Sequence, residues 1–327
     1  MACLRQSLQS AAVLAALAAL AAPAFAADYP ARPVSIITPV PAGSGPDVIA
    51  RYVADRLGKV WKQQVLILNR PGAGGLMSVQ AAATAKPDGY TLYMPISSTL
   101  VVLPVTHPKL PIDLSRDIVP VGLIGEQPMV VAANAKLAVR SLAELIARAK
   151  KQPGAISYGA NLGGLPNLTA EVLQQRATIR LALIPYPNTA KAVQDAAAGI
   201  VQLAFESLSG LAGPIQSGML KPLAIASTNR VPDFPDLPTF TEAAPALGVF
   251  EARGWFTLMA PAGTPDAIVS RLSTDLRGVL EQPDLQKRFA SLGTYVHPMS
   301  PGETATFIRS EQELWKPVVR HAMPEAR

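Results

Sequence analysis

The sequence predicts an α/β fold made of two lobes joined by a hinge. Short β-branched runs alternate with stretches of helical periodicity along most of the chain, which is the pattern of an α/β sheet. A chain of 327 residues with 49% hydrophobic residues is long enough for two domains. No long flexible linker separates the two parts, so we expect the chain to cross between them repeatedly and to leave a cleft.

Residues 1–26 have the features of a secretory signal peptide. Arg5 supplies the positive charge, an apolar run over 11–22 follows, and residues 24–26 read Ala-Phe-Ala, a typical cleavage site. The apolar run is shorter than the ~20 residues that a transmembrane helix needs. We therefore expect cleavage after Ala26 and export to the periplasm, with an uncleaved membrane anchor as the alternative.

The composition argues against several classes of function. The only cysteine, Cys3, lies in the predicted signal peptide, so the mature chain has no disulfide, thiol nucleophile or thiolate metal ligand. The net charge is +6, but the basic residues form no run and aromatic residues make up only 6%, which disfavours nucleic-acid binding. The basic excess suits anionic solutes, although a generally basic proteome explains it equally well.

The first part of the mature chain repeats a strand, a loop and a helix. The predicted elements are a strand over 34–38, a loop over 39–46, a helix with apolar residues from Ile49 to Val60, a strand over 65–68, a glycine loop over 69–75, a helix over 77–85 and a strand over 91–94. Both glycine-rich loops follow a strand and precede a helix. They should therefore lie at the carboxyl ends of adjacent parallel strands, where open α/β sheets bind ligands.

The rest of the chain continues in the same style. The predicted strands are 130–133, 156–158, 183–184, 201–205, 223–227 and 255–259. The predicted helices are 141–151, 168–175, 190–198, 264–280, 283–292 and 300–321. Capping boxes at Ser141–Glu144 and Ser300–Glu303 mark two of the helix starts, and the Pro- and Asp-rich residues 231–238 should be irregular.

The two glycine loops predict an anion site. Glycines at strand-to-helix turns expose backbone N–H groups at a helix N-terminus, and two such loops side by side can hold one carboxylate. The alternative is that these glycines only make tight turns. A nucleotide site is disfavoured, because Val48 replaces the third glycine of G-x-G-x-x-G and no Lys-Ser/Thr pair follows Gly75.

Enzymatic motifs are scarce. His107, His297 and His321 are far apart and show no metal-ligand spacing, and the sequence lacks a G-x-S-x-G elbow. We therefore expect no enzyme activity, no cofactor and no metal. A secreted hydrolase remains an alternative, because a catalytic triad can assemble from distant residues.

Several polar residues in the middle of the chain are candidate ligand contacts. Tyr158, Asn161 and Thr189 lie where predicted strands give way to loops and offer neutral donors and acceptors. Glu206 follows an apolar strand and can accept a hydrogen bond from a ligand amine or hydroxyl, or it is a solvated loop acid. Arg253 can pair with a ligand carboxylate, or it is a surface residue.

Short motifs spread over the mature chain carry a family resemblance in their order and spacing. They are Tyr29-Pro30, Arg32-Pro33, Pro41-Ala42-Gly43-Ser44-Gly45-Pro46-Asp47, Asn69-Arg70-Pro71-Gly72-Ala73-Gly74-Gly75, Pro87-Asp88-Gly89-Tyr90-Thr91-Leu92, Leu110-Pro111, Asp117, Tyr158-Gly159, Pro185-Tyr186, Leu237-Pro238-Thr239 and Ala260-Pro261-Ala262-Gly263-Thr264-Pro265. With them the chain resembles the solute receptors of tripartite tricarboxylate transporters, the Bug receptors.

The resemblance implies a Venus-flytrap fold, like the type II periplasmic binding proteins, with a hinge and an interlobe cleft. Lobe one would comprise residues 27–125 and 259–327, and lobe two residues 126–258. The implied function is capture of a small organic carboxylate and its delivery to a membrane permease, by a protein that is not itself membrane-embedded. A periplasmic sensory adaptor for a signalling partner is the alternative.

The resemblance also implies the ligand-binding residues. In lobe one they are Ala42, Gly43, Ser44, Gly45, Asp47, Gly72, Ala73, Gly74 and Gly75. In lobe two they are Tyr158, Asn161, Thr189, Ala190, Glu206 and Ser207.

The chain departs from the family pattern in ways that affect specificity. Ser44 and Pro46 interrupt the usual glycine run, and Pro46 removes one N–H donor. The loop over 160–165 is one residue short, Glu206 stands where the family has Asp, and Leu76 stands where Asn is common. The carboxylate site is thus retained while the specificity side is more apolar, which favours an aromatic or alkyl carboxylate.

Overall fold

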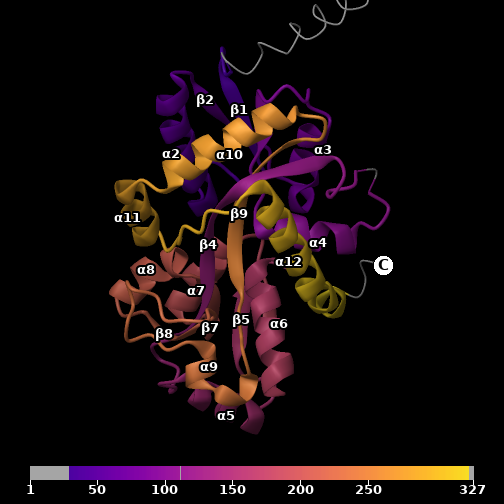
Figure 1. Ribbon diagram of the computed structural model, residues 1–327. Helices are drawn as coiled ribbons and strands as arrows, with labels where there is room; N and C mark the ends of the chain where they lie inside the picture. Colours follow the sequence, from indigo (N-terminus) through magenta and orange to yellow (C-terminus); the bar gives the residue numbers. More distant parts are fainter. Residues whose placement is uncertain (1–28, 111, 324–327) are drawn as a thin grey trace, which may run out of the picture.

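A nine-stranded sheet forms the centre of the protein, with strand order β2-β1-β3-β9-β4-β7-β5-β6 and β8 paired to β4 (Figure 1). The computed structural model describes residues 29–110 and 112–323, so the predicted signal peptide lies outside the described residues. The strands are β1 (Val34–Thr38), β2 (Val65–Asn69), β3 (Thr91–Tyr93), β4 (Ile118–Asn134), β5 (Ser157–Ala160), β6 (Ala182–Pro185), β7 (Leu203–Ser207), β8 (Leu220–Ile225) and β9 (Arg253–Pro261).

The first half of the sheet confirms the predicted repeat of strand, loop and helix. β1 pairs in parallel with β2 on one side and with β3 on the other. The helices that follow these strands are α2 (Gly45–Trp61), α3 (Leu76–Ala83) and α4 (Ser97–Thr106). The sequence prediction missed α4, which contains Pro104 in its interior. A short 3-10 turn, η2 (Ala73–Gly75), precedes α3.

The two crossing strands, β4 and β9, add antiparallel pairs to the sheet. β9 is antiparallel to both β3 and β4. β4 pairs with β9 from Ile118 to Pro128 and then, from Met129 onward, with β7 and β8. The sheet is therefore mixed, and the long strand β4 belongs to both of its halves (Figure 1).

The second half repeats the strand-then-helix arrangement. β7, β5 and β6 are neighbouring parallel strands. The helices of this half are α5 (Leu142–Lys151), α6 (Leu165–Ala177), α7 (Thr189–Ala198), α8 (Leu208–Gln216) and α9 (Phe240–Ala243), followed by the 3-10 turn η3 (Pro245–Leu247). Gly199 ends α7 in the left-handed region, as predicted.

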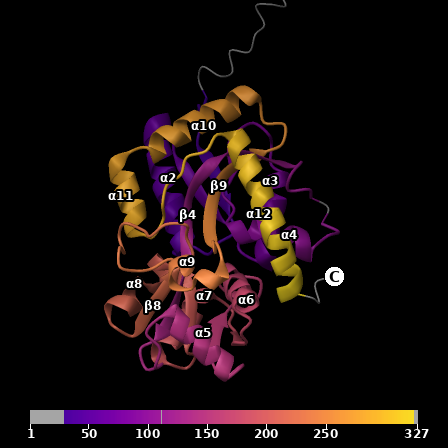
Figure 2. The ribbon, with the colours of Figure 1, turned by 60° about the horizontal axis from the view of Figure 1, so that its bottom comes forward.

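The C-terminal helices return to the first half of the sheet (Figures 1 and 2). They are α10 (Asp266–Leu280), α11 (Pro283–Ser291) and α12 (Pro301–Ala322). α10 packs on α2 and β4, whereas α12 packs on α4, β4 and α6. Across residues 29–110 and 112–323, the helices are too short or too polar to span a membrane.

The two predicted capping boxes differ in outcome. Ser300 and Glu303 form the complete reciprocal pair at the start of α12. At the start of α5, the Ser141 hydroxyl accepts from the Glu144 N–H, but the Glu144 carboxylate accepts from the N–H of Arg140 instead of Ser141. The capping box at Ser141 is therefore incomplete, although both helices begin where predicted.

Three apolar clusters hold these layers together. One lies between the sheet and α2, α10 and α11, and contains Leu57, Leu272 and Phe289. A second lies mainly in the other half of the protein, around Val130, Leu208 and Leu211. The largest extends from α3, α4 and α12 through the crossing strands to β5 and β7. This shared core joins the two halves at the crossing strands.

Candidate ligand-binding site

Helices α2, α3 and α4 begin at the carboxyl ends of neighbouring parallel strands. β1 lies between β2 and β3, so the three helix N-termini gather at one edge of the sheet, as predicted for the first two. The first N–H groups of a helix have no acceptor within it. Among the described residues, none of these three helices has a side-chain cap. This edge therefore offers backbone donors and a positive partial charge to an anion.

Asp47 holds the first glycine loop in shape from beneath. Its carboxylate accepts hydrogen bonds from the N–H of Gly43 (2.8 Å), from Nε of Arg51 (2.8 Å) and from Nδ2 of Asn69 (2.8 Å). Only 1% of Asp47 is exposed. The structure thus gives this residue, expected among the ligand contacts, a buried and fully engaged carboxylate, while Ala42, Gly43 and Gly45 are exposed above it.

The charge of Asp47 is stabilised by the same contacts. Burial disfavours the charged carboxylate, but hydrogen bonds from Arg51, Asn69 and the Gly43 N–H together outweigh it and hold the pKa of Asp47 below its ordinary value. Ser44 turns its hydroxyl back to the carbonyl of Pro41 (2.8 Å). The exposed part of the loop is therefore mostly backbone.

The second glycine loop has a backbone that few other residues could adopt. Ala73, Gly74 and Gly75 all have positive φ, of 46°, 62° and 99°. A Cβ atom on Gly75 would lie 2.7 Å from the Thr99 side chain, so only glycine fits against α4 there. Gly72, Ala73 and Gly74 are exposed. The loop therefore packs on α4 at Gly75 and leaves the preceding residues accessible.

Hydroxyl groups support this loop from below. Ser78 donates to the carbonyl of Gly75 (2.6 Å) and lies 3.0 Å from the hydroxyl of Tyr93. Burial raises the pKa of Tyr93, so the phenol stays neutral. Ser97 and Thr99, in the first turn of α4, are also buried. Sequence reasoning missed this third helix start, although the Ser-Ser-Thr run that begins three residues after the predicted strand 91–94 was a usable signal.

The lobe-two candidates lie within or just after β5, β6 and β7, which are also neighbouring parallel strands. The structure brings Asn161 and Thr189 together, since the Thr189 hydroxyl donates to Oδ1 of Asn161 (3.4 Å). Ala190 is exposed in the first turn of α7, behind the Asn188 cap. Leu162, next to Asn161, has 57% of its surface exposed.

Tyr158 does not have the exposed side chain that a ligand contact requires. It is fully buried, with a ring that packs edge-to-face on Phe205. Its hydroxyl accepts from Asn167 (3.2 Å) and donates to Glu171 (3.3 Å). In this structure Tyr158 is a core residue that supports the loop after β5.

Glu206 and Ser207 end β7 and begin α8. Oε1 of Glu206 accepts from the backbone N–H of Ser207 (2.7 Å), and the Ser207 hydroxyl lies 3.0 Å from that of Ser209. Desolvation raises the pKa of Glu206, although the side chain remains partly exposed. Glu206 is thus a half-buried residue whose surroundings disfavour the charged carboxylate. Ser207 itself is buried.

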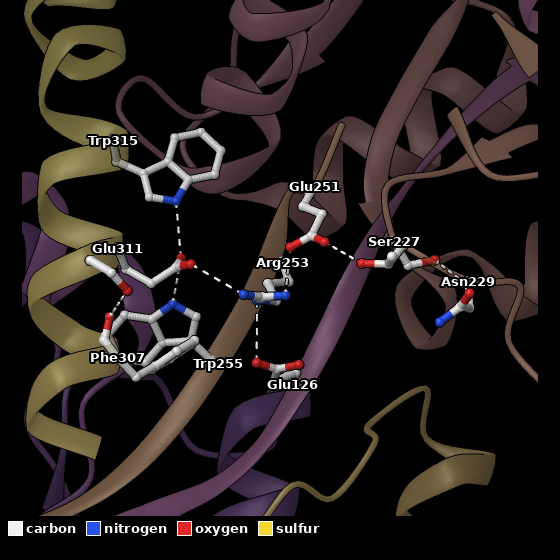
Figure 3. Close-up of polar contacts among 11 residues, drawn as sticks. Glu126, Ser227, Asn229, Glu251, Arg253, Trp255, Phe307, Glu311 and Trp315 are labelled. Carbon is white, nitrogen blue, oxygen red and sulfur yellow. Dashed lines mark hydrogen bonds and ion pairs between the residues drawn. The ribbon is translucent and has the colours of Figure 1, made fainter. Parts of the chain in front are cut away.

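Arg253 is occupied by protein carboxylates, not placed freely for a ligand (Figure 3). Its guanidinium lies 3.2 Å from Glu126, 2.9 Å from Glu251 and 3.4 Å from Glu311. Glu311, on α12, also accepts from the indole N–H groups of Trp255 (3.0 Å) and Trp315 (3.1 Å). This cluster lies where β4 changes partner, so it joins α12 to the crossing strands.

Gly74→Asn tests the second glycine loop. A Cβ atom at Gly74 meets nothing within 4 Å, and asparagine tolerates a φ of 62° better than most residues, so we expect the fold to persist. We expect the added side chain to cover the exposed face of this loop and to lower carboxylate affinity by about tenfold or more, measured by calorimetry. Gly218→Asn, at an equally open position with φ 72°, is the matched control. Unchanged affinity in a folded Gly74 variant would count against the loop.

The histidines were the other candidates for catalytic or metal-binding chemistry. His107 and His297 are exposed. In the part of the chain that the structure describes, no three His, Asp or Glu side chains are placed to hold a metal ion.

Known proteins are similar to this chain along most of its length. Protein BugT of Bordetella pertussis (strain Tohama I) is 37% identical over 303 residues, which cover 91% of this chain and 92% of BugT. A solved structure described as a periplasmic transporter has a TM-score of 0.80 at 33% identity, over 89% of this chain and 97% of the other. The R. palustris protein Rpa4515, solved with adipate, has a TM-score of 0.82 at 28% identity, over 90% and 98% of the two chains.

A third structure, MatC from Rhodopseudomonas palustris with bound malate, has a TM-score of 0.78 at 28% identity, over 89% of this chain and all of MatC. These similarities show the two-lobed α/β fold of periplasmic binding proteins. The family model described as tripartite tricarboxylate transporter family receptor matches residues 49–323. The chain therefore belongs to the family of tripartite tricarboxylate transporter receptors.

Proposed function

We propose that this protein is a periplasmic solute-binding receptor that holds a small organic carboxylate between its lobes. The observation that carries the proposal is the meeting of three uncapped helix N-termini, those of α2, α3 and α4, at one sheet edge. Relatives solved with adipate and with malate support the same ligand class. The protein would bind and release its ligand unchanged, without catalysis.

We place the lobes as the sequence predicts, with 27–125 and 259–327 in lobe one and 126–258 in lobe two. The change of β4 partner between Pro128 and Met129 supports the first boundary to within a few residues. The second boundary lies between residues 258 and 259, a few residues after Arg253, where the pairing of β9 with β4 begins. The crossing strands β4 and β9 would then be the hinge, and bending them would close the lobes.

The proposed binding sequence follows from where the donors lie. The carboxylate first meets the glycine loops, whose residues Ala42, Gly43, Gly72 and Gly74 are exposed. The loops after β5, β6 and β7 then close on the rest of the ligand, and their added contacts favour the closed form. That form would be recognised by the permease of a tripartite transporter. Export would follow cleavage of the predicted signal peptide after Ala26.

A thermal-shift screen of residues 27–327 against mono-, di- and tricarboxylates, amino acids and aromatic acids tests the proposal. A ligand at a hundred times its Kd adds about 2.7 kcal/mol to the free energy of unfolding, which raises the melting temperature by a few degrees. The methyl ester of the active acid is the control and should give no shift, because it lacks the anion. A panel in which no acid shifts the melting temperature would overturn the carboxylate function.

A further inference from the structure

The loop before α6, in lobe two, has the same backbone geometry as the first glycine loop in lobe one. In each, a turn contains a glycine with positive φ, 82° at Gly43 and 69° at Gly163. The next residue, Ser44 or Gly164, precedes the helix with φ −71° in both and ψ of 161° and 156°. The N–H of that residue closes the turn on the carbonyl three residues earlier, over 3.3 and 3.1 Å. The two lobes thus present equivalent loops.

A buried side chain in the first turn of each helix fixes this loop. Asp47 accepts a hydrogen bond from the N–H of Gly43 (2.8 Å), and Oδ1 of Asn167 accepts one from the N–H of Gly163 (3.2 Å). Each of the two side chains belongs to the residue four places after its glycine, directly after a proline. Both residues are only 1% exposed. Asn167 is therefore the lobe-two counterpart of Asp47, with a neutral amide in place of a carboxylate.

Buried hydrogen bonds orient the amide of Asn167. Its Nδ2 donates to the hydroxyl of Tyr158 (3.2 Å), which donates to Oε1 of Glu171 (3.3 Å). Gln174 also donates to Glu171 (3.3 Å), and its own Oε1 accepts from the N–H of Leu181 (2.7 Å). A carboxylate can only accept, so the Tyr158 hydroxyl must donate to it and accept from Asn167. This order leaves Oδ1 of Asn167 facing the loop.

The loop held in this way carries a predicted ligand contact. Asn161 begins the turn, and a Cβ atom on Gly164 would lie 2.4 Å from its amide, so the Asn161 side chain packs directly on the loop backbone. Gly163 and Gly164 are buried, whereas Leu162 is exposed. The placement of Asn161 and Leu162 therefore depends on backbone that Asn167 fixes.

We infer that Asn167 is a positioning residue for ligand capture, because it fixes the loop over 161–164 as Asp47 fixes the first glycine loop. The inference rests on the proposed carboxylate-binding function. Asn167 is almost fully buried, so it acts through the loop and not by touching the ligand. Lobe two closes after lobe one in the proposed binding sequence, so loss of this contact should mainly speed ligand release.

Asn167→Ala tests the inference in the mature chain, residues 27–327. Calorimetry is carried out with adipate and with the acid of the thermal-shift panel that gives the largest shift. We expect affinity to fall by about tenfold, with most of the change in the dissociation rate measured by stopped flow. The N–H of Gly163 loses its acceptor, so its hydrogen exchange, measured by NMR without ligand, should speed up by about tenfold or more.

Asn134→Ala is the matched control, because it makes the same change at another buried amide of lobe two. Asn134 is 4% exposed and donates to the carbonyls of Ala196 (2.7 Å) and Ala197 (3.0 Å). These carbonyls lie at the opposite end of α7 from Thr189. Both variants leave buried backbone groups unpaired and should lower the melting temperature by a few degrees. Only Asn167→Ala should weaken binding.

Two further variants separate the contacts of Asn167. Asn167→Asp keeps an acceptor for the N–H of Gly163, so affinity should stay within about twofold of the parent. Tyr158→Phe removes the hydroxyl that orients Asn167 but leaves the ring that packs on Phe205, so it should fold. We expect it to weaken binding by about fivefold and to speed exchange at Gly163.

The outcomes distinguish this inference from the proposed function. Parent-like affinity or unchanged Gly163 exchange in Asn167→Ala or Tyr158→Phe would overturn the inference while carboxylate binding stands. An equal loss of affinity in Asn134→Ala, or no recovery in Asn167→Asp, would also overturn it, because affinity would then follow stability alone. A panel in which no acid binds the parent would remove the proposed function and the inference with it.

Discussion

Asp47→Ala is expected to abolish measurable carboxylate binding and to lower the free energy of unfolding by about 2–4 kcal/mol. The substitution removes the acceptor of two hydrogen bonds, one from the Gly43 N–H and one from Nδ2 of Asn69, each 2.8 Å long. Without that acceptor the first glycine loop loses the contact that fixes its shape. Denaturant unfolding and calorimetry measure the two effects on the same protein.

Asp55→Ala is the matched control for this prediction. Asp55 also lies on α2 and also pairs with a cation four residues later, Lys59, at 2.7 Å. It is exposed, however, and an exposed pair of this kind contributes only about 0.5 kcal/mol. The control should therefore bind normally and unfold almost like the parent. Equal losses in the two variants would mean that Asp47 acts only as a helix-surface charge.

The effect of Asp47 depends on pH in a defined direction. Because the folded protein holds the pKa of Asp47 below its unfolded value, its stabilising contribution is present above the unfolded pKa, near 3.9. The contribution is lost as the pH falls through the folded pKa. The stability difference between the parent and Asp47→Ala should therefore be largest near neutral pH and should narrow below pH ~4.

The first half of the fold was readable from sequence because its signals are local. Pro and Gly end each strand between Val34 and Gly75, and the apolar spacing from Ile49 to Val60 fits one helix face. The observed β1, α2 and β2 match these elements closely. The pairing of β1 with β2 also followed, because short connections favour adjacent parallel strands.

The crossing strands were not readable in the same way. The first part of β4 contains Pro120, Gly122, Gly125 and Pro128, which read as loop residues in a local window. Pairing with β9, more than a hundred residues later, keeps this segment extended, and register irregularities between Pro120 and Gly125 accommodate the interruptions. Tertiary pairing here overrides local preference.

Side-chain direction was the other feature that sequence left open. Tyr158 and Glu206 both lie near the ends of lobe-two strands, yet the first is fully buried and the second is partly exposed. Which side chain faces outward depends on the pleat and register of each strand, and these are set by partners elsewhere in the chain. Arg253 likewise meets Glu311 only because α12 returns to the crossing strands.

Glu311→Ala is expected to have the largest effect on stability, a loss of about 3–5 kcal/mol. One carboxylate that is 4% exposed serves three donors: the indoles of Trp255 and Trp315 and the guanidinium of Arg253. Truncation leaves two buried indole N–H groups without an acceptor. It also leaves Arg253 paired only with Glu126 and Glu251 (Figure 3). Denaturant unfolding followed by tryptophan fluorescence measures the loss.

Glu313→Ala is the control on the same helix, since Glu313 is 76% exposed and lies 3.6 Å from Lys316. Its unfolding midpoint should stay close to that of the parent. The chain has three tryptophans, and two of them donate to Glu311, so the emission of the folded state should change in Glu311→Ala and not in the control. A normal midpoint together with normal emission in Glu311→Ala would show that this cluster does not stabilise α12 on the crossing strands.

Because Glu311 lies on α12, outside the loops assigned to the ligand, a variant that remains folded should keep most of its carboxylate affinity, in contrast to Asp47→Ala.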